Sequence, residues 1–363
     1  MTDVRKINPG SGKDRLIRPE VRALRAYEVA DATGLIKLDA MENPYSWPPE
    51  LVSKWQRLLA AAPINRYPDP GASVLRQVLR RRIGLADEFG LLLGNGSDEI
   101  IQMLLLALDR DCAVIAPTPT FVMYEMSAKT VGLPYVGVPL GPEFVLDAER
   151  LLEAAATVRP GVIFIAYPNN PTGNLFSTKE IERVIRGTDA LVVVDEAYFP
   201  FAGSTFMDRL QEFENLLVMR TLSKEGLAGL RLGFIAGHRS WIDEIDKVRL
   251  PYNINCVTQI TVAFALEQSR MLAAQAEQIR ASRARLFEGL SAIPGIRAWP
   301  SDANFILFRT HGANEVFDGL RRRGVLIKNL AGSGLPGFLR VTVGTDEENR
   351  CFLQALRDEM APA

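Results

Sequence analysis

The sequence predicts an α/β protein, in which a largely parallel sheet is covered by helices and followed by a smaller α+β region. Five apolar runs lack the polar alternation of a half-exposed strand, which is typical of strands buried on both faces. Helical segments separate these runs, and such alternation favours parallel pairing. The runs are CAVIAP (112–117), GVIFIAYP (161–168), ALVVVDEA (190–197), NLLVMRT (215–221) and RLGFIAGH (231–238).

The N-terminal region reads as an arm. Residues 1–36 are mostly polar, and one short helical segment is expected from Pro19 to Tyr27. Strand–helix alternation follows, with amphipathic helical patterns expected at 73–82, 99–108 and 178–187. These elements together predict a large α/β domain.

The pattern changes near residue 256. A stretch from about Val257 to Ala292 is rich in Ala, Leu, Glu and Arg, which favours one long helix. Shorter mixed elements follow it to the C-terminus. Since 363 residues exceed what one core usually holds, we expect more than one domain. The predicted limits are an arm at 1–36, a large domain at 37–256 and a small α+β domain at 257–363.

Composition argues against several classes of protein. Lys and Arg number 42 and Asp and Glu number 43, a balance that does not favour nucleic acid or an anionic membrane as partner. No apolar stretch approaches the roughly 18 residues of a membrane span, and no signal peptide is evident. Three scattered cysteines and two histidines offer no metal-ligand spacing and no serine–histidine triad. We expect a cytoplasmic protein without a metal.

The stretch GNGSDEII (94–101) is a candidate anion site. It follows an apolar run and opens a predicted helix, where backbone N–H groups and close-approaching glycines suit a phosphate. Ser97 would either cap the helix or donate to the anion. The carboxylates of Asp98 and Glu99 suit the helix dipole but would repel a phosphate unless they point away. An ordinary capped helix explains this stretch equally well on its own.

Two turns after predicted strands carry further candidates. In PTPTFVMY (117–124), Phe121 is placed to stack on a planar ligand, although a core aromatic is the simpler explanation. In YPNNPTGN (167–174), Asn170 is placed to donate a hydrogen bond to a ligand, although turn asparagines usually bond their own backbone.

The run VVVDEAYFPF (192–201) ends a buried strand in a carboxylate. Asp195 would lose hydration there and needs a partner, such as a protonated ring nitrogen. Tyr198, three residues on, offers a phenol. A metal is the other usual partner, but the few histidines do not support one.

The stretch RTLSKEGLAGLRLG (220–233) offers an amine. Desolvation at the end of a strand would lower the pKa of Lys224 and free it as a nucleophile toward an aldehyde. Ser223 and Arg231 supply a hydroxyl and a guanidinium fork, both suited to a phosphate. A lone lysine is more often a surface residue, so the ensemble carries the argument. One ligand uses an amine, a ring-nitrogen partner, a stacking face and a phosphate cradle together, and that ligand is pyridoxal 5′-phosphate.

With these motifs in order, the sequence resembles the fold-type I pyridoxal-phosphate-dependent aminotransferases over nearly its whole length. The motifs that carry the resemblance are LIKLDAMENPY, NRYPDP, GNGSDEII, PNNPTGN, VVVDEAYFPF, RTLSKEGLAGLRLG, PYNIN, SDANFIL and LRVTVGTDEEN. The resemblance implies a large domain built on a mostly parallel seven-stranded sheet. It also points to the subfamily that transaminates L-histidinol phosphate with 2-oxoglutarate in histidine biosynthesis.

The resemblance also implies roles for the residues. Lys224 would bind the cofactor and move the proton, and Asp195 would keep the pyridine nitrogen protonated. The remaining contacts would come from Asn170 and Tyr198 on the phenolic oxygen, Phe121 on the ring, and Ser97, the Asp98 backbone, Ser223 and Arg231 on the phosphate.

Further implied roles concern the partner and the substrate. Tyr67 would reach the cofactor phosphate of a second subunit, which implies a homodimer with shared active sites. Arg340 would bind the substrate's anionic group, and Tyr45 and Asn304 would line the substrate pocket.

Three departures from the family pattern matter. Met41 stands where members often have asparagine, which puts contacts from that position in question. Lys328 would also bind the substrate, but it stands where members often have arginine and supplies a point charge in place of a bidentate fork, so we expect weaker or reorganised phosphate binding there. Lys224 and Arg231 are seven residues apart where members often show eight, so we expect a tighter turn between them.

Other functions stay open at this stage. The guanidinium of Arg340 suits a carboxylate as well as a phosphate, so aromatic amino acid transamination and phosphoamino acid decarboxylation are alternatives. A non-catalytic ligand-sensing module of the same fold is a third, although the intact pair of Lys224 and Asp195 argues against it. A dinucleotide enzyme would need a GxGxxG turn, which the first strand lacks.

Overall fold

A computed structural model describes residues 16–24, 26 and 29–361. Its largest sheet has seven strands in the order β2-β8-β7-β6-β5-β3-β4, as the resemblance implied. All neighbours pair in parallel except β8, which is antiparallel to β7 and β2. The strands are β2 (Phe89–Gly94), β3 (Ala113–Thr118), β4 (Tyr135–Pro139), β5 (Pro160–Ala166), β6 (Leu191–Asp195), β7 (Leu216–Thr221) and β8 (Gly233–His238).

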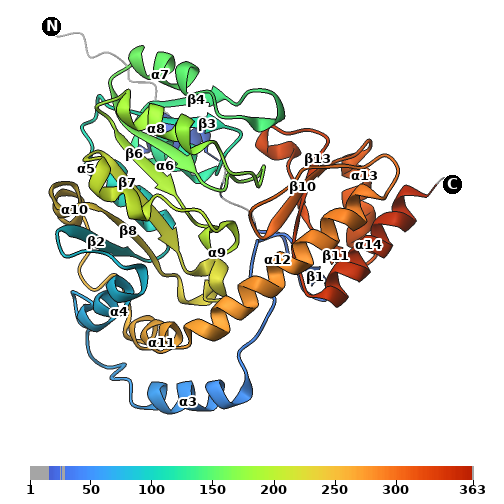
Figure 1. Ribbon diagram of the computed structural model, residues 1–363, viewed down its shortest axis with the longest axis horizontal. Coiled ribbons are helices and arrows are strands. Elements are labelled where there is room, and N and C mark those ends of the chain that lie inside the picture. The colour runs from blue at the N-terminus through green and yellow to red at the C-terminus, as the bar shows by residue number, and fades with distance from the viewer. Residues whose placement is uncertain (1–15, 25, 27–28, 362–363) are drawn as a thin grey trace, which may run out of the picture.

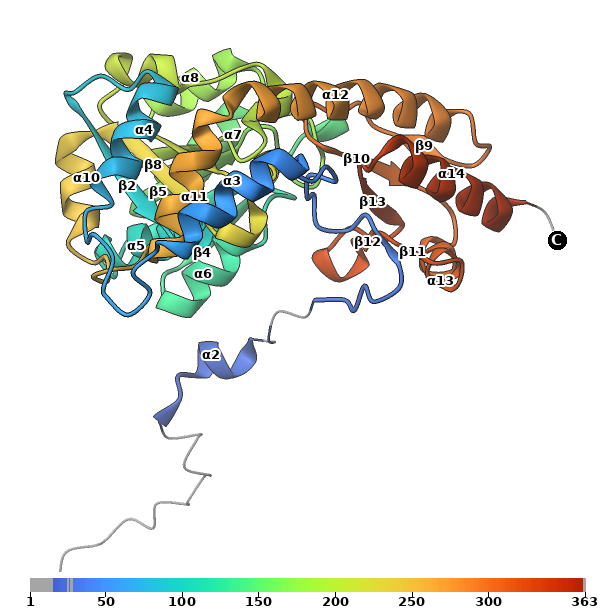
Figure 2. The same cartoon turned by 90° about the horizontal axis from the view of Figure 1, so that it is seen from below.

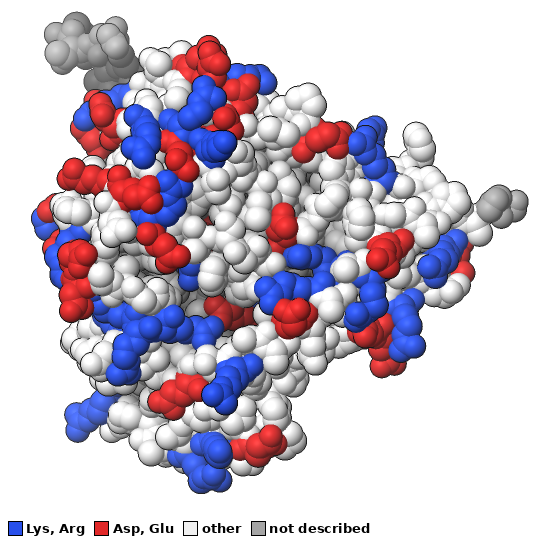
Figure 3. All heavy atoms as spheres, viewed as in Figure 1, with Lys and Arg blue, Asp and Glu red and all other residues white. Residues whose placement is uncertain are grey.

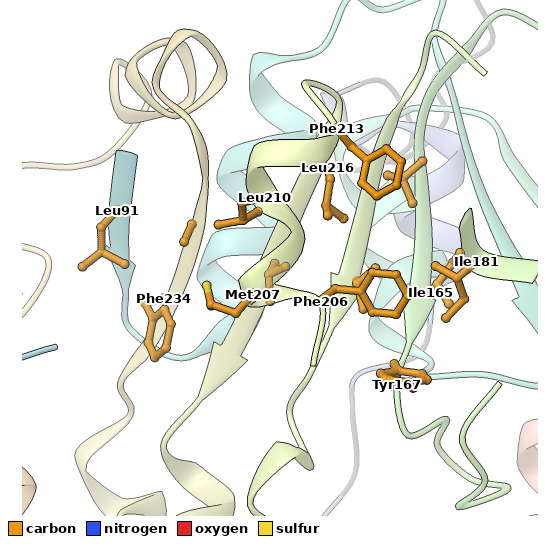
Figure 4. Close-up of a cluster of buried hydrophobic side chains, with 14 of the residues drawn as sticks. Leu91, Ile165, Tyr167, Ile181, Phe206, Met207, Leu210, Phe213, Leu216 and Phe234 are labelled. Carbon is orange, nitrogen blue, oxygen red and sulfur yellow. The ribbon is translucent and has the colours of Figure 1, made fainter. Parts of the chain in front are cut away.

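Two layers of helices sandwich this sheet (Figure 1). Successive strand residues pack to opposite faces, because side chains alternate along a strand. One face packs against α4 (Ser73–Ile83), α7 (Ala148–Ala156), α8 (Thr178–Arg186) and α11 (Cys256–Glu267), and the other against α5 (Ser97–Ala107), α6 (Met123–Val131) and α10 (Arg239–Asp246). Figure 4 shows part of the core on the first face, where Phe206 and Phe213 pack with strand residues such as Ile165 and Phe234.

The five apolar runs are confirmed as strands β3, β5, β6, β7 and β8. Burial on both faces explains why they lack polar alternation, since most of their residues are buried. The predicted long helix is wrong as a single element. It is divided at Gln268 into α11 and α12 (Ser269–Ser291), and Gln268 has a non-helical ψ of 31°.

A four-stranded antiparallel sheet forms the C-terminal part, to the right in Figure 1. The order is β12 (Lys328–Asn329), β13 (Phe338–Thr342), β10 (Phe305–Arg309) and β9 (Arg297–Ala298), and the sheet packs with α12, α13 (Ala313–Arg322) and α14 (Asp346–Met360).

The N-terminal segment crosses to this C-terminal part. Strand β1 (Ile36–Lys37) pairs in parallel with β11 (Val325–Leu326), and Leu38 and Met41 belong to the C-terminal core. The predicted domain limits at residues 36 and 256 therefore stay predictions. Of the arm, the structure describes helix α2 (Pro19–Ala23), which is seen in the lower part of Figure 2 and contacts α6, where Arg18 donates to the backbone carbonyl of Thr130. Helix α3 (Pro49–Ala60) follows. Tyr27, the predicted end of the arm helix, lies outside the described residues.

The charged residues are mixed on the face that Figure 3 shows, with Lys and Arg beside Asp and Glu over most of it. No helix in residues 16–24, 26 and 29–361 is long and apolar enough to cross a membrane. The same part of the chain contains no group of three or more His, Cys, Asp or Glu residues that would hold a metal.

Candidate active site

The carboxyl ends of the parallel strands converge on one cavity. Because β8 runs the other way, its first residues lie at this same edge, so segments from both ends of the β7–β8 connection meet there. The predicted residues that line the cavity are Ser97, Asp98, Phe121, Asn170, Asp195, Tyr198, Ser223, Lys224 and Arg231. Nine side chains that are scattered over 135 positions of the sequence thus meet at one place.

The N-terminus of α5 forms one wall of the cavity. No side chain caps this helix, so its first backbone N–H groups are not satisfied by a capping side chain. Gly96 precedes the helix with φ of +84°, and a Cβ there would lie 2.7 Å from Nη2 of Arg231. Glu99 turns away from the cavity, since its carboxylate accepts from the backbone of Asn95 at 2.6 Å and from Asn253 at 2.8 Å. The wall therefore offers donors to an anion.

Arg231 stands opposite this helix end. The chain reaches it through two short 3₁₀ turns, Ser223–Glu225 and Ala228–Leu230, and Arg231 itself adopts a left-handed conformation with φ of 49°. This is the tight turn that the seven-residue spacing predicts. The Arg231 guanidinium lies 3.5 Å from Oγ of Ser223 and 3.1 Å from a carboxylate oxygen of Asp98. Asp98 therefore directs its charge toward the guanidinium.

Asp195 ends β6 with a buried carboxylate. The phenol of Tyr124 donates to Oδ2 at 2.6 Å, and the backbone N–H of Ala197 donates to Oδ1 at 3.1 Å. Burial raises the pKa of Asp195 to about 6, and these two donors oppose that rise. The carboxylate is thus ionised at neutral pH and held in a fixed orientation.

Lys224 is the amine of the cavity. Its Nζ donates to the backbone carbonyl of Ala40 at 3.2 Å and lies 6.0 Å from the ring centroid of Tyr198. Burial, and then the positive charge of Arg340, lower the pKa of Lys224 to about 8. A substantial fraction of neutral amine is therefore present near physiological pH, which a nucleophile or a base requires.

A second cavity of about 600 Å³ adjoins the first, and the two share Met41, Phe121 and Asn170 as walls. Lys328 and Arg340, both predicted to bind substrate, line this second cavity. They are direct neighbours across strands β12 and β13. Its size lies in the range of small-molecule sites.

Arg340 already holds internal contacts. It is buried, and it donates to the side-chain oxygen of Asn170 and, at 3.0 Å, to the backbone carbonyl of Asp39. Its guanidinium lies 5.2 Å from the ring centroid of Phe305. Arg340 therefore joins β13 to the turn after β5.

Three predicted residues line neither cavity in this chain. Tyr67 is 80% exposed and stacks on Tyr252, with ring centroids 4.5 Å apart. Asn304 is fully buried and donates to the backbone carbonyl of Met41 at 2.9 Å, so it lies behind a cavity wall. Tyr45 packs against the C-terminal core. The roles proposed for them stay predictions.

Sequence reasoning missed three residues at the site. Nothing in the sequence shows that the phenol of Tyr124 reaches Asp195, as it does in the structure. Thr221 lines the first cavity, and its hydroxyl lies 3.0 Å from Oγ of Ser223. Met41 lines both cavities, although from the sequence it is only a departure from the family pattern with no predicted contact.

A larger cavity of about 770 Å³ has none of the predicted residues among its walls. It is bordered by Arg220 and Glu225. The buried carboxylate of Glu196 accepts from Arg220 at 2.8 Å, so adjacent residues Asp195 and Glu196 make their contacts separately, with Tyr124 and with Arg220.

Comparison with known proteins agrees with this geometry. Histidinol-phosphate aminotransferase 2 of Nitrosococcus oceani is 55% identical over 95% of this chain and 98% of its own. The protein of the same name from Cupriavidus pinatubonensis is 51% identical over 94% of this chain and 96% of its own. Among solved structures, the histidinol-phosphate aminotransferase of Sinorhizobium meliloti in complex with pyridoxal-5′-phosphate superposes with a TM-score of 0.84. The two sequences are 21% identical, and the superposition covers 95% of this chain and 97% of the other.

The family comparison covers most of the chain. Residues 33–356 match the model of aminotransferase class I and II, and this range contains every residue of the two cavities. The chain belongs to the aminotransferase class I and II family, and it is an enzyme of that family.

Proposed function

We propose that this enzyme transfers the amino group of L-histidinol phosphate to 2-oxoglutarate, yielding imidazole acetol phosphate and glutamate, in histidine biosynthesis. The observation that carries the proposal is the first cavity, where the amine of Lys224, the carboxylate of Asp195 and the uncapped end of α5 face one another. The names of the relatives at 55% and 51% identity support the choice of substrate.

The residues present fit pyridoxal phosphate. The α5 N-terminus, Ser223 and Arg231 would hold the phosphate, and the space left by Gly96 keeps the cradle open. Phe121 would pack on the ring. Asn170 and Tyr198 would bond its phenolic oxygen, and Asp195 its nitrogen. When bound, the cofactor supplies an aldehyde carbon for the substrate amine and a ring that accepts electrons from the substrate carbon.

Lys224 would carry out the proton transfers. Its pKa of about 8 lets it accept a proton from the substrate Cα and release it again at a neighbouring carbon. Asp195 stays ionised at neutral pH, because its pKa is about 6, and provides the negative charge that a protonated ring nitrogen needs. At neutral pH Asp195 is therefore mostly ionised, and Lys224 has a minor fraction of neutral amine that can act as the base.

The second cavity would bind the rest of the substrate. Lys328 and Arg340 lie side by side on neighbouring strands and supply two positive charges for a phosphate. A carboxylate would also fit them, so the substrate must be tested against an aromatic amino acid.

We also propose a homodimer with shared active sites, located in the cytoplasm. Tyr67 is 80% exposed, and Ile64 and Leu250, which lie near Tyr67 and Tyr252 in the sequence, are 80% and 71% exposed, so apolar side chains flanking the stacked tyrosines along the chain face solvent. Burial of these side chains against a second copy would place Tyr67 at the partner's phosphate cradle. The three free cysteines suit a reducing compartment.

The first experiment is a titration of the cofactor-loaded protein with L-histidinol phosphate in the absence of an oxo acid, followed by absorbance. We expect the visible cofactor band to disappear at low substrate concentration and to return on addition of 2-oxoglutarate. If L-phenylalanine bleaches the band and L-histidinol phosphate does not, the proposed substrate is wrong. If neither does, the proposed function is wrong.

A further inference from the structure

Tyr124 links two parts of the first cavity that come from different elements. It lies in the first turn of α6 and is completely buried. Its ring stacks on Phe164, with centroids 4.5 Å apart and planes at 7°, and meets the ring of Phe121 edge-on at 5.5 Å. Its hydroxyl donates to Asp195 at 2.6 Å.

Resting on the function proposed above, we propose that Tyr124 is a positioning residue that holds Asp195 for the cofactor's ring nitrogen and Phe121 for the cofactor's ring face. Phe121 would contact the ring from its face and Asp195 from its edge. A single side chain that contacts both fixes the angle between the two contacts, which a planar ligand requires.

The direction of the hydrogen bond follows from the burial of both groups. Burial and the neighbouring charge of Asp195 raise the pKa of Tyr124 well above its ordinary value, so the phenol keeps its proton and donates it. The Ala197 N–H occupies the other carboxylate oxygen. With a donor on each oxygen, the carboxylate plane cannot rotate freely, and its remaining lone pairs have a fixed direction.

Phe164 explains why the ring itself does not move. It belongs to β5 and is completely buried, so Tyr124 stacks on a side chain that the sheet holds in place. Phe164 in the sheet thus contacts Tyr124, and Tyr124 in turn contacts Phe121 and Asp195, the two residues proposed to contact the cofactor ring. The position of Asp195 therefore depends on a helix as well as on its own strand.

Two variants separate the hydroxyl from an ordinary packing role. Tyr124→Phe removes the donor and keeps the ring that contacts Phe121 and Phe164. The matched control is Tyr167→Phe, which removes a hydroxyl that is bonded to Oγ of Ser204 at 2.8 Å on another buried tyrosine. The Tyr167 ring packs on the opposite face of the sheet from Tyr124, and its backbone N–H, which bonds to the Asp195 backbone carbonyl at 2.8 Å, is kept in the variant. Unfolding temperatures of both variants would show that each protein folds.

The readout is the affinity of the cofactor-free protein for two probes at pH 8, pyridoxal phosphate and its 1-deaza analogue, in which carbon replaces the ring nitrogen. Both probes share the phosphate, the aldehyde and the ring face, so the ratio of their dissociation constants isolates the contact of Asp195 with the nitrogen. We expect Tyr124→Phe to reduce the wild-type preference for pyridoxal phosphate about tenfold, and Tyr167→Phe to leave it unchanged.

The outcomes separate the inference from the proposed function. An unchanged ratio in Tyr124→Phe overturns the inference while the transaminase activity stands. If the wild-type protein itself shows no preference for pyridoxal phosphate, the role of Asp195 fails and the inference fails with it. Tyr124→Leu also removes the ring that supports Phe121. It should therefore lower the affinity for both probes by a common additional factor. A loss of affinity confined to one probe would contradict the role of Tyr124 in positioning Phe121.

Discussion

Lys224 illustrates how a single residue of this site can lower the folding stability of the cofactor-free protein. The lysine is half-buried, and its pKa lies at about 8 in place of 10.5, so its charged form is less stable in the folded protein than in the unfolded chain. Well below pH 8 the amine is charged in both the folded and the unfolded state, and the full destabilisation is present. As the pH rises from 8 to 10.5 the folded protein loses its proton first, and the cost disappears.

Replacement of Lys224 by methionine should therefore stabilise the cofactor-free protein. We expect a gain of about 2–3 kcal/mol at pH 7 that vanishes near pH 11, measured by urea unfolding at both values. Lys247→Met is a suitable control, because that lysine is exposed and paired with Glu244 on the surface. A Lys224→Met protein that is no more stable than wild type at pH 7 would show that the amine is not desolvated.

Lys328 tests the departure from the family pattern. It lies beside Arg340 across β12 and β13 at the wall of the second cavity. Lys328→Arg would provide a planar fork where the chain has a point charge, so we expect KM for L-histidinol phosphate to fall about threefold with little change in kcat. Steady-state kinetics would check this, with L-phenylalanine as a substrate that has no phosphate. An equal effect on both substrates would place Lys328 away from the phosphate.

Helix α5 shows how an element, and not a side chain, can provide a binding group. Its N-terminus has no capping side chain, and Gly96 has a positive φ and no room for a Cβ beside Arg231. The chain gives up a stabilising cap there, which typically contributes about 1 kcal/mol, in exchange for open N–H donors.

Gly96→Ala should accordingly lower the affinity for pyridoxal phosphate by more than tenfold, because the new methyl group would displace the Arg231 guanidinium. Gly84→Ala is the control: Gly84 ends α4 with φ of +65°, and a Cβ there would meet nothing within 4 Å. Gly84→Ala should lose about 1 kcal/mol of folding stability from its left-handed conformation. Gly96→Ala should lose more, because φ of 84° and ψ of 166° lie in a region that essentially only glycine adopts, and it alone should lose cofactor affinity. If a fluorescence titration gave Gly96→Ala and Gly84→Ala the same affinity for pyridoxal phosphate, the proposed phosphate site at the start of α5 would be wrong.

At the level of elements, the sequence predicts strands better than contacts. Continuous apolar runs indicate doubly buried strands because periodicity is a local property, and all five were confirmed. The break of the long helix at Gln268 has no glycine or proline to announce it, so local propensity favours continuity. The bond between Tyr124 and Asp195 joins residues 71 positions apart, and only the packing of α6 against the sheet determines it.

The whole molecule raises the question of what Tyr67 does. It is 80% exposed and lines neither cavity of its own chain, while the other residues proposed to hold the phosphate line the first cavity together. In a dimer with shared sites, Tyr67 and Lys224 of one site would come from different subunits.

Hybrid dimers test this arrangement. A dimer of one Tyr67→Ala subunit and one Lys224→Ala subunit should contain one site with both native residues, and hence about half of wild-type activity per dimer. Two affinity tags would isolate the hybrid, and kcat would be measured together with the number of high-affinity cofactor sites. If Tyr67 serves its own chain, no site in the hybrid is intact, and activity falls to that of Tyr67→Ala or below.

The connection between β7 and β8 has a consequence for how the sequence of such a protein can change. It carries Lys224 near its start and Arg231 near its end, and the left-handed conformation of Arg231 closes the turn. An inserted or deleted residue would rotate one of these side chains away from the cavity while the other stayed in place. The length of this segment and its backbone conformation are therefore coupled, and gain or loss of a residue there requires a simultaneous change of that conformation.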